Sequence, residues 1–151
     1  MAIERVQDWP ILLDEYIRDH LNKPFTWGDN DCCLFACTAV QILTGIDPAE
    51  SWRGKYTSRE AALHLAQVRG CNTVYDIAKS MAAQYGFEEI MPGFASRGDI
   101  VCHTSTNPNG LGQTLAVVGA GVCYGPGDNG LIVTQLGDII TRKTTKAWKI
   151  G

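Results

Sequence analysis

The chain has 151 residues, 45% of them hydrophobic, and its formal net charge is -3. This length predicts a single domain, residues 1–151, with one main hydrophobic core. Acidic residues number 16 against 13 lysines and arginines, and no basic run exceeds two residues, which disfavours nucleic acid as a partner because phosphate binding needs clustered cations.

The sequence carries no sign of membrane insertion or secretion. No apolar stretch approaches the roughly 20 residues that cross a bilayer, and the charged N-terminal stretch lacks the apolar segment of a signal peptide. We therefore expect the protein to be synthesised in the cytoplasm and to have no membrane segment. Six cysteines in such a chain are expected to be reduced thiols rather than a disulfide framework.

The first part of the chain predicts helices. Apolar residues at helical spacing, with a proline in the first turn, indicate an amphipathic helix over about residues 10–21. Asp31 or Asn30 is expected to cap a second helix that stops at Gly45. Apolar residues cover nearly all sides of this second helix, so we expect it to be the buried central helix.

Two further helices and then a sheet are predicted. Residues 57–60, Thr-Ser-Arg-Glu, are interpreted as a capping box that opens a helix to about Val68, and Asn72 is expected to cap the next helix. After Gly86, short β-like runs alternate with Gly, Pro and Asn; they span residues 99–103, 114–119, 121–124, 131–133 and 147–150. Helices followed by an antiparallel meander predict an α+β fold.

Two short motifs stand at informative places in this plan. Trp27-Gly28 forms an aromatic-glycine turn shortly before Asp31-Cys32, which opens the central helix, and residues 97–101 read Arg-Gly-Asp-Ile-Val. In this order the motifs resemble the NlpC superfamily of papain-like cell-wall cysteine peptidases, with its aromatic-Gly turn, Asp-Cys-Ser-Gly and Pro-Gly-Asp-Leu-Val. The resemblance implies a papain-like domain in which N-terminal helices pack on a C-terminal antiparallel sheet.

A narrower likeness involves two other patterns. Residues 24–32 read Pro-Phe-x-Trp-Gly-x-x-Asp-Cys and residues 147–150 read Ala-Trp-x-Ile. They resemble a group of small phage and prophage proteins whose genes tend to sit among tail-assembly genes. This resemblance implies a tail-tip component of the virion, made in the bacterial cytoplasm, whose partners are other tail-tip or hub proteins.

Cys32 is the candidate nucleophile position. In the resembled peptidases a thiolate follows the Asp of this motif, here Asp31, at a helix N-terminus, where free N–H groups and the macrodipole stabilise the anion. The backbone N–H of Cys32 or Cys33 could donate to an oxyanion. The partner histidine of the family begins the second strand, and here Thr114 stands in that place. Because threonine cannot act as a base near neutral pH, we expect catalysis by this mechanism to be absent.

Another histidine could replace the missing base. His20 and His64 are expected to be surface or packing residues of their helices. His103 is the alternative base, because it ends the strand next to the one that holds Thr114. Strand alternation gives Cys102 and His103 opposite faces, and we assign Cys102 to the core and His103 outward.

Metals and cofactors are not expected. Cys33 and Cys37 share a helix face, but zinc and iron–sulfur sites need further paired ligands on turns. The glycine-rich segments 107–112 and 125–130 are interpreted as connectors of the meander, and neither precedes a helix, so a phosphate cradle is disfavoured. Four thiols are expected to behave as small buried hydrophobes: those of Cys33, Cys37, Cys71 and Cys123.

Two functions stay open. We favour a phage tail-tip structural or assembly protein with an inactive peptidase-like fold, a pseudoenzyme, because the histidine is replaced by Thr114. The alternative is an active peptidase or amidase that cuts peptidoglycan during DNA entry, with His103 or a partner's histidine as base. The C-terminal residues 146–150 are a candidate contact surface: Trp148 either anchors a partner or packs inward as part of the closing strand.

Overall fold

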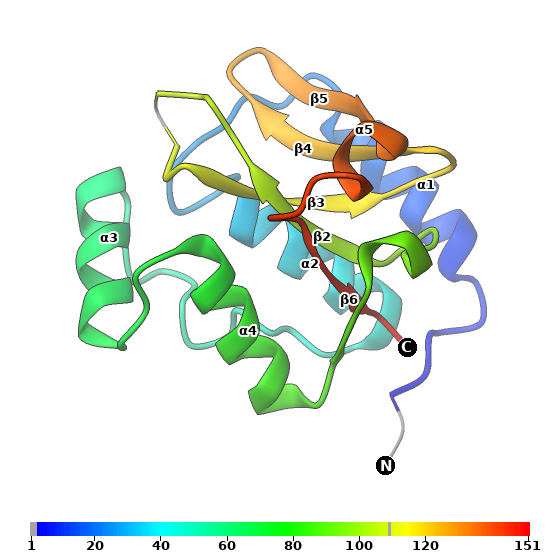
Figure 1. The fold of residues 1–151 in the computed structure, drawn as a ribbon, viewed down its shortest axis with the longest axis horizontal. Helices are drawn as coiled ribbons and strands as arrows, with labels where there is room; N and C mark the ends of the chain where they lie inside the picture. Colours follow the sequence, from blue (N-terminus) through cyan, green and yellow to red (C-terminus); the bar gives the residue numbers. More distant parts are fainter. Residues whose placement is uncertain (1–2, 109) are drawn as a thin grey trace.

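The computed structural model describes residues 3–108 and 110–151 (Figure 1). Helices come first and a sheet follows, which confirms the α+β class. The elements in chain order are α1 Trp9–His20, α2 Cys32–Thr44, α3 Arg59–Val68, α4 Val74–Tyr85, β1 Glu88–Ile90, the short 3-10 helix η1 Pro92–Phe94, β2 Ile100–Thr104, β3 Gln113–Val118, β4 Val122–Gly127, β5 Gly130–Gln135, α5 Leu136–Ile140 and β6 Lys146–Lys149.

The described strands form one six-stranded antiparallel sheet in the order β1-β6-β2-β3-β4-β5. Strands β2 to β5 are the predicted meander. The C-terminal strand β6 returns between β1 and β2, so it is an interior strand. Figure 1 shows α2 and α5 on opposite sides of the sheet, in agreement with their separate apolar clusters.

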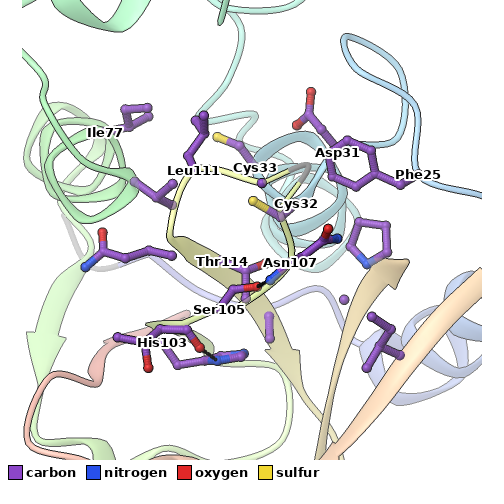
Figure 2. A pocket seen from close by; sticks show the side chains of 18 of the residues that line it. Phe25, Asp31, Cys32, Cys33, Ile77, His103, Ser105, Asn107, Leu111 and Thr114 are labelled. Atoms are coloured by element: carbon purple, nitrogen blue, oxygen red, sulfur yellow. Dashed lines mark hydrogen bonds between the residues drawn. The ribbon is translucent and has the colours of Figure 1, made fainter. Parts of the chain in front are cut away.

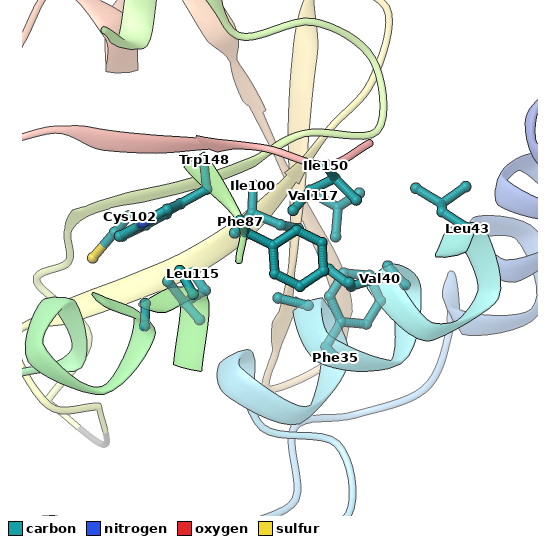
Figure 3. Close-up of a cluster of buried hydrophobic side chains, with 14 of the residues drawn as sticks. Phe35, Val40, Leu43, Phe87, Ile100, Cys102, Leu115, Val117, Trp148 and Ile150 are labelled. Carbon is teal, nitrogen blue, oxygen red and sulfur yellow. The ribbon is translucent and has the colours of Figure 1, made fainter. Parts of the chain in front are cut away.

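Helix α2 is the centre of the molecule, as its composition predicts. Asp31 caps it by accepting a hydrogen bond from the Leu34 N–H, and Gly45 ends it with a φ of 81°. One side of α2 packs on the sheet: Phe35 and Val40 belong to one apolar cluster with Val117 and other core residues of the strands (Figure 3). The other side belongs to a second apolar cluster with α3 and α4. A helix packed on two sides must be apolar all round.

Trp148 is only 3% exposed and belongs to the main core (Figure 3). Its strand pairs with β2 on one side and β1 on the other, and its ring lies 5.9 Å from that of Tyr75. The prediction that Trp148 could anchor a partner is therefore wrong, and the inward alternative is confirmed. The Ala-Trp-x-Ile motif serves the core, since Ala147 and Ile150 are buried as well.

The Arg-Gly-Asp motif before β2 ties the two ends of the chain together. Buried Asp99 accepts hydrogen bonds from Ser96 and from the Ile150 N–H, and it forms an ion pair of 3.0 Å with Arg5. The Arg5 side chain also donates to the carbonyl oxygens of Arg97 and Ile150. Gly98 has a φ of 92°, and a Cβ there would meet the Arg5 guanidinium at 2.7 Å. These contacts give the Arg-Gly-Asp motif a structural role in packing.

Some predicted boundaries are wrong. Ser58, not Thr57, caps α3, because its side chain accepts from the Ala61 N–H. Thr73, not Asn72, caps α4 and forms a reciprocal capping box with Asp76. Much of the predicted connector 125–130 is strand, since Gly127 pairs with Gly130 across a two-residue turn. In the other predicted connector, 107–112, Asn109 lies outside the described residues.

Candidate functional site

A cavity of about 470 Å³ opens beside the N-terminus of α2 (Figure 2). The chain before α2 and the loop before α3 contribute aromatic walls, which are Phe25, Trp27, Trp52 and Tyr56. The loop after β2 and the start of β3 contribute polar groups, which include Ser105, Asn107, Gln113 and Thr114. Cys32 and Cys33 lie between these walls, so the cavity is the place where the candidate nucleophile position meets solvent.

Asp31 holds the turn that precedes Cys32. It is 1% exposed, and its carboxylate accepts hydrogen bonds from the Leu34 N–H, the Gly28 N–H and the Tyr56 hydroxyl at 2.9, 3.0 and 2.7 Å. Burial, followed by the negative charge of Asp31, raises the pKa of Tyr56, so this hydroxyl stays a donor. With three donors in place, Asp31 acts as a structural anchor.

Steric crowding explains the glycine of the aromatic-glycine turn. Gly28 has a φ of 82°, and a Cβ at this position would lie 2.2 Å from the Tyr56 carbonyl oxygen. Only glycine allows the backbone to approach the loop before α3 this closely. Trp27 packs edge-on against Phe25, with ring centroids 4.9 Å apart, and both rings line the cavity.

The Cys32 thiol is a weak acid in this setting. Its pKa is raised to about 11, first by burial and then by the negative charge of Asp31. Interactions with the Leu115 backbone and the Thr114 side chain act in the opposite direction and lower the Cys32 pKa in part. The position at the helix N-terminus is the one predicted, yet desolvation outweighs the stabilisation that a helix dipole gives a thiolate.

Thr114 interacts with the Cys32 thiol, whereas His103 lines the same cavity without acting on that thiol. His103 is the cross-strand partner of Thr114, and its ring interacts with the Thr104 carbonyl oxygen at 2.9 Å. In Figure 2 Thr114 and Ser105 stand between the Cys32 thiol and the His103 ring. Among the described residues that act on the Cys32 pKa, none is a histidine.

The predicted strand faces are confirmed in part. Cys102 is 1% exposed and packs in the core under α2, as assigned. His103 points to the other face but is partly buried, and this burial lowers its pKa. His20 interacts with the Tyr16 carbonyl oxygen within α1, and His64 is exposed on α3. Neither joins the cavity lining.

All six cysteines lie in the described chain, and all are free. Cys37, Cys71 and Cys123 are buried as predicted, whereas Cys33 is partly exposed at the cavity. Within residues 3–108 and 110–151, no group of three or more His, Cys, Asp or Glu is placed to hold a metal. None of the described helices has the length and apolar character needed to span a bilayer.

The sequence did not predict the aromatic wall of the cavity or the hydrogen bond that Tyr56 donates to Asp31. Tyr56 is 25 residues from Asp31, and no local pattern signals their hydrogen bond. The polar loop after β2 gives only a turn signal in the sequence, although it forms one side of the cavity. The motif before α2 locates Cys32, but its surroundings come from distant segments.

The fold and the site define a class: an α+β protein with a cysteine at the start of its central helix, facing a cavity with a threonine beside it. The chain belongs to the family described as "Domain of unknown function (DUF6950)", whose model matches residues 4–150. Comparison with curated proteins and with solved structures found no match.

Proposed function

We propose that this protein is an NlpC-type, papain-like module without peptidase activity that serves as a structural or assembly subunit of a phage or prophage tail tip. The loss of activity is inferred from one observation: the side chain next to the Cys32 thiol is that of Thr114 and not an imidazole. The resemblance of residues 24–32 and 147–150 to small tail-associated phage proteins supports the location.

The chemistry of the site supports the loss of activity. Cysteine peptidases need a thiolate and a group that returns a proton to the leaving amine. With a pKa of about 11, the Cys32 thiol is protonated near neutral pH. The Thr114 hydroxyl donates to the Leu115 carbonyl oxygen at 3.2 Å and cannot serve as a base. Asp31 is occupied by its three donors.

The cavity supports a role through contact. Its aromatic rings lie on one wall and its hydroxyl and amide groups on the other, a mixture typical of binding sites. Of the acidic and basic side chains that line the described cavity, Asp31 is buried and Arg142 is exposed, so the accessible wall is neutral apart from one arginine. A neutral cavity suits a protein segment better than a polyanion.

Two measurements test this proposal. Purified protein incubated with peptidoglycan should release no muropeptides, and Cys32→Ser should behave like the wild type. Mass spectrometry of isolated particles and tail intermediates should detect the chain. Release that Cys32→Ser abolishes would overturn the inactive site, and absence of the chain from particles and intermediates alike would overturn the structural role.

One observation favours the alternative, an active peptidase or amidase that acts on peptidoglycan. Cys32 begins α2 and lines an open cavity, as a nucleophile must. His103 lines the same cavity as Cys32, but among the described residues no histidine acts on the Cys32 pKa, so this function needs either a movement of His103 toward Cys32 or a histidine from a partner chain. Activity that is lost in Cys32→Ser would identify this function, and His103→Ala would then name the base: loss of activity points to His103, and retained activity points to a partner's histidine.

A further inference from the structure

Three sulfur atoms lie together outside the Cys32 and Thr114 pair. Cys37 of α2 and Met81 of α4 face each other, with Sγ and Sδ 3.6 Å apart. Cys33 lies one turn earlier on α2, on the same helix face as Cys37, and interaction with the Cys37 side chain is the largest cause of the raised pKa of the Cys33 thiol. All three belong to the apolar cluster between α2, α3 and α4.

We propose that Cys33, Cys37 and Met81 form a binding site for one soft monovalent metal ion, Cu(I). Thiolate and thioether sulfurs are the ligands that Cu(I) prefers over harder ions. Metal–sulfur bonds of about 2.3 Å in a trigonal arrangement place the sulfurs roughly 4 Å apart. The Cys37–Met81 separation of 3.6 Å is close to this spacing, so small side-chain rotations complete the site.

The backbone favours a bridging ion over a disulfide. Cys33 and Cys37 are four residues apart on α2, and Cβ atoms at this spacing are roughly 5–6 Å apart. A disulfide requires about 3.8 Å between Cβ atoms. An ion between the two sulfurs spans the longer distance without distortion of the helix.

Zinc does not fit this set of ligands. Structural zinc takes four ligands, mostly Cys and His. The described chain offers no group of three His, Cys, Asp or Glu at this place. Two thiols and a thioether suit an ion that accepts two or three sulfur ligands.

The site has an entrance and a partial charge balance. Cys33 lines the cavity and is partly exposed (Figure 2), so an ion can enter there. Binding releases two thiol protons to solvent and leaves one net negative charge. Arg53, whose guanidinium is ion-paired with Asp47 and also interacts with the charge of Cys37, offsets it in part, as does the N-terminal end of α2. Asp31 opposes it, and because binding releases protons, affinity should rise with pH.

The experiment titrates the reduced full-length protein with Cu(I) under anaerobic conditions against a chromophoric chelator. We expect one ion per chain with an all-sulfur coordination shell in X-ray absorption. Cys33→Ala and Cys37→Ala should abolish competition with the chelator. Met81→Leu should weaken binding at least about tenfold, the smallest loss seen even for outer-shell partners of metal sites.

Matched controls separate this site from other thiols. Cys71→Ala and Cys123→Ala remove buried thiols elsewhere, and Cys32→Ala removes the thiol next to Cys33; all three variants should bind like the wild type. Circular dichroism verifies folding. If Cys37→Ala unfolds, the test rests on Met81→Leu and Cys33→Ala. Met81→Leu preserves side-chain volume, and Cys33→Ala changes a partly exposed residue, so both variants should stay folded.

Three results would each overturn the proposal. These are no competition by the wild type, unchanged binding in both Cys33→Ala and Met81→Leu, and loss of binding in the Cys32, Cys71 or Cys123 controls. The outcome is independent of the tail-tip proposal, because none of the three sulfurs takes part in the peptidase-like mechanism.

Discussion

The side chain of Thr114 interacts with the Cys32 thiol at the N-terminus of α2. The two residues are far apart in sequence, and the packing of β3 on α2 brings them together. In the resembled peptidases an imidazole stands at the position of Thr114. Under our proposal Thr114 takes the place of that imidazole and leaves the Cys32 thiol without a base, so Thr114 is the position at which a base could be introduced.

Thr114→His should make Cys32 more reactive. An imidazole beside a thiol lowers the thiol pKa, so we expect alkylation of Cys32 by iodoacetamide at pH 7 to be about tenfold faster or more. Peptide mapping by mass spectrometry follows Cys32 separately from the other cysteines. Thr114→Val, which removes the hydroxyl and adds no base, should stay as slow as the wild type. An equally slow Thr114→His would show that geometry beyond this residue is lost.

The pH dependence of Cys32 alkylation should reflect its raised pKa. With a pKa of about 11 in the folded protein, the thiolate fraction at pH 7 is about one in ten thousand and rises roughly tenfold per pH unit. The rate should therefore climb from pH 7 to pH 10 without a plateau. Asp31→Asn removes the second cause of the shift and should move the curve to lower pH. A plateau below pH 8 in the wild type would contradict this account.

Asp31→Ala should destabilise the fold more than loss of an ordinary helix cap. Cap removal costs about 1 kcal/mol, and a buried donor left unpaired costs about 1–3 kcal/mol. The Gly28 N–H and the Tyr56 hydroxyl both lose their acceptor, so the unfolding free energy in urea should fall by roughly 3 kcal/mol or more. Ser58→Ala, which removes only the α3 cap, should lose about 1 kcal/mol. Equal losses would show that Asp31 is only a cap.

Local patterns were sufficient to predict α2 and the meander. An acid-amide run before an all-apolar segment predicts Asn30 or Asp31 as the N-cap and Cys32 in the first turn, and the structure has Asp31 as the cap. Alternation of side chains places Cys102 in the core and His103 on the other face. These features depend on residues close together in sequence, where periodicity and capping carry the information.

Long-range pairings were not predictable in the same way. β1 pairs with β6 through Glu89 and Trp148, which are separated by most of the sheet in sequence. The pairing with β1 makes β6 an interior strand, and the register of Trp148 opposite Ile100 of β2 turns its ring into the core. The hydrogen bond from Tyr56 to Asp31 likewise depends on a loop whose course no local pattern fixes.

The buried thiols should make the protein sensitive to alkaline pH. Burial raises the pKa of Cys102 to about 12 and that of Cys123 to about 11, from an ordinary value of 9.0. Between pH 9 and these values the unfolded chain loses thiol protons that the folded chain keeps, so ionisation favours unfolding. The unfolding free energy should fall by about 1.4 kcal/mol per pH unit for each thiol above pH 9, and this contribution is absent below it. Urea unfolding in reducing buffer from pH 8 to pH 10.5 measures the slope.

The contribution of one thiol is isolated by comparing, between the wild type and two variants, how steeply the unfolding free energy falls with pH. Above pH 9 the unfolding free energy of Cys102→Ala should fall less steeply with pH than that of the wild type, because one titrating group is gone. Val101→Ala opens a cavity on the same strand at a fully buried position without a titrating group, so it should lower stability at every pH and leave the slope unchanged. Tyrosines and lysines that titrate in this range are present in all three proteins and cancel in the comparison. Identical slopes in the wild type and Cys102→Ala would mean that the Cys102 thiol ionises in the folded protein as readily as in the unfolded chain.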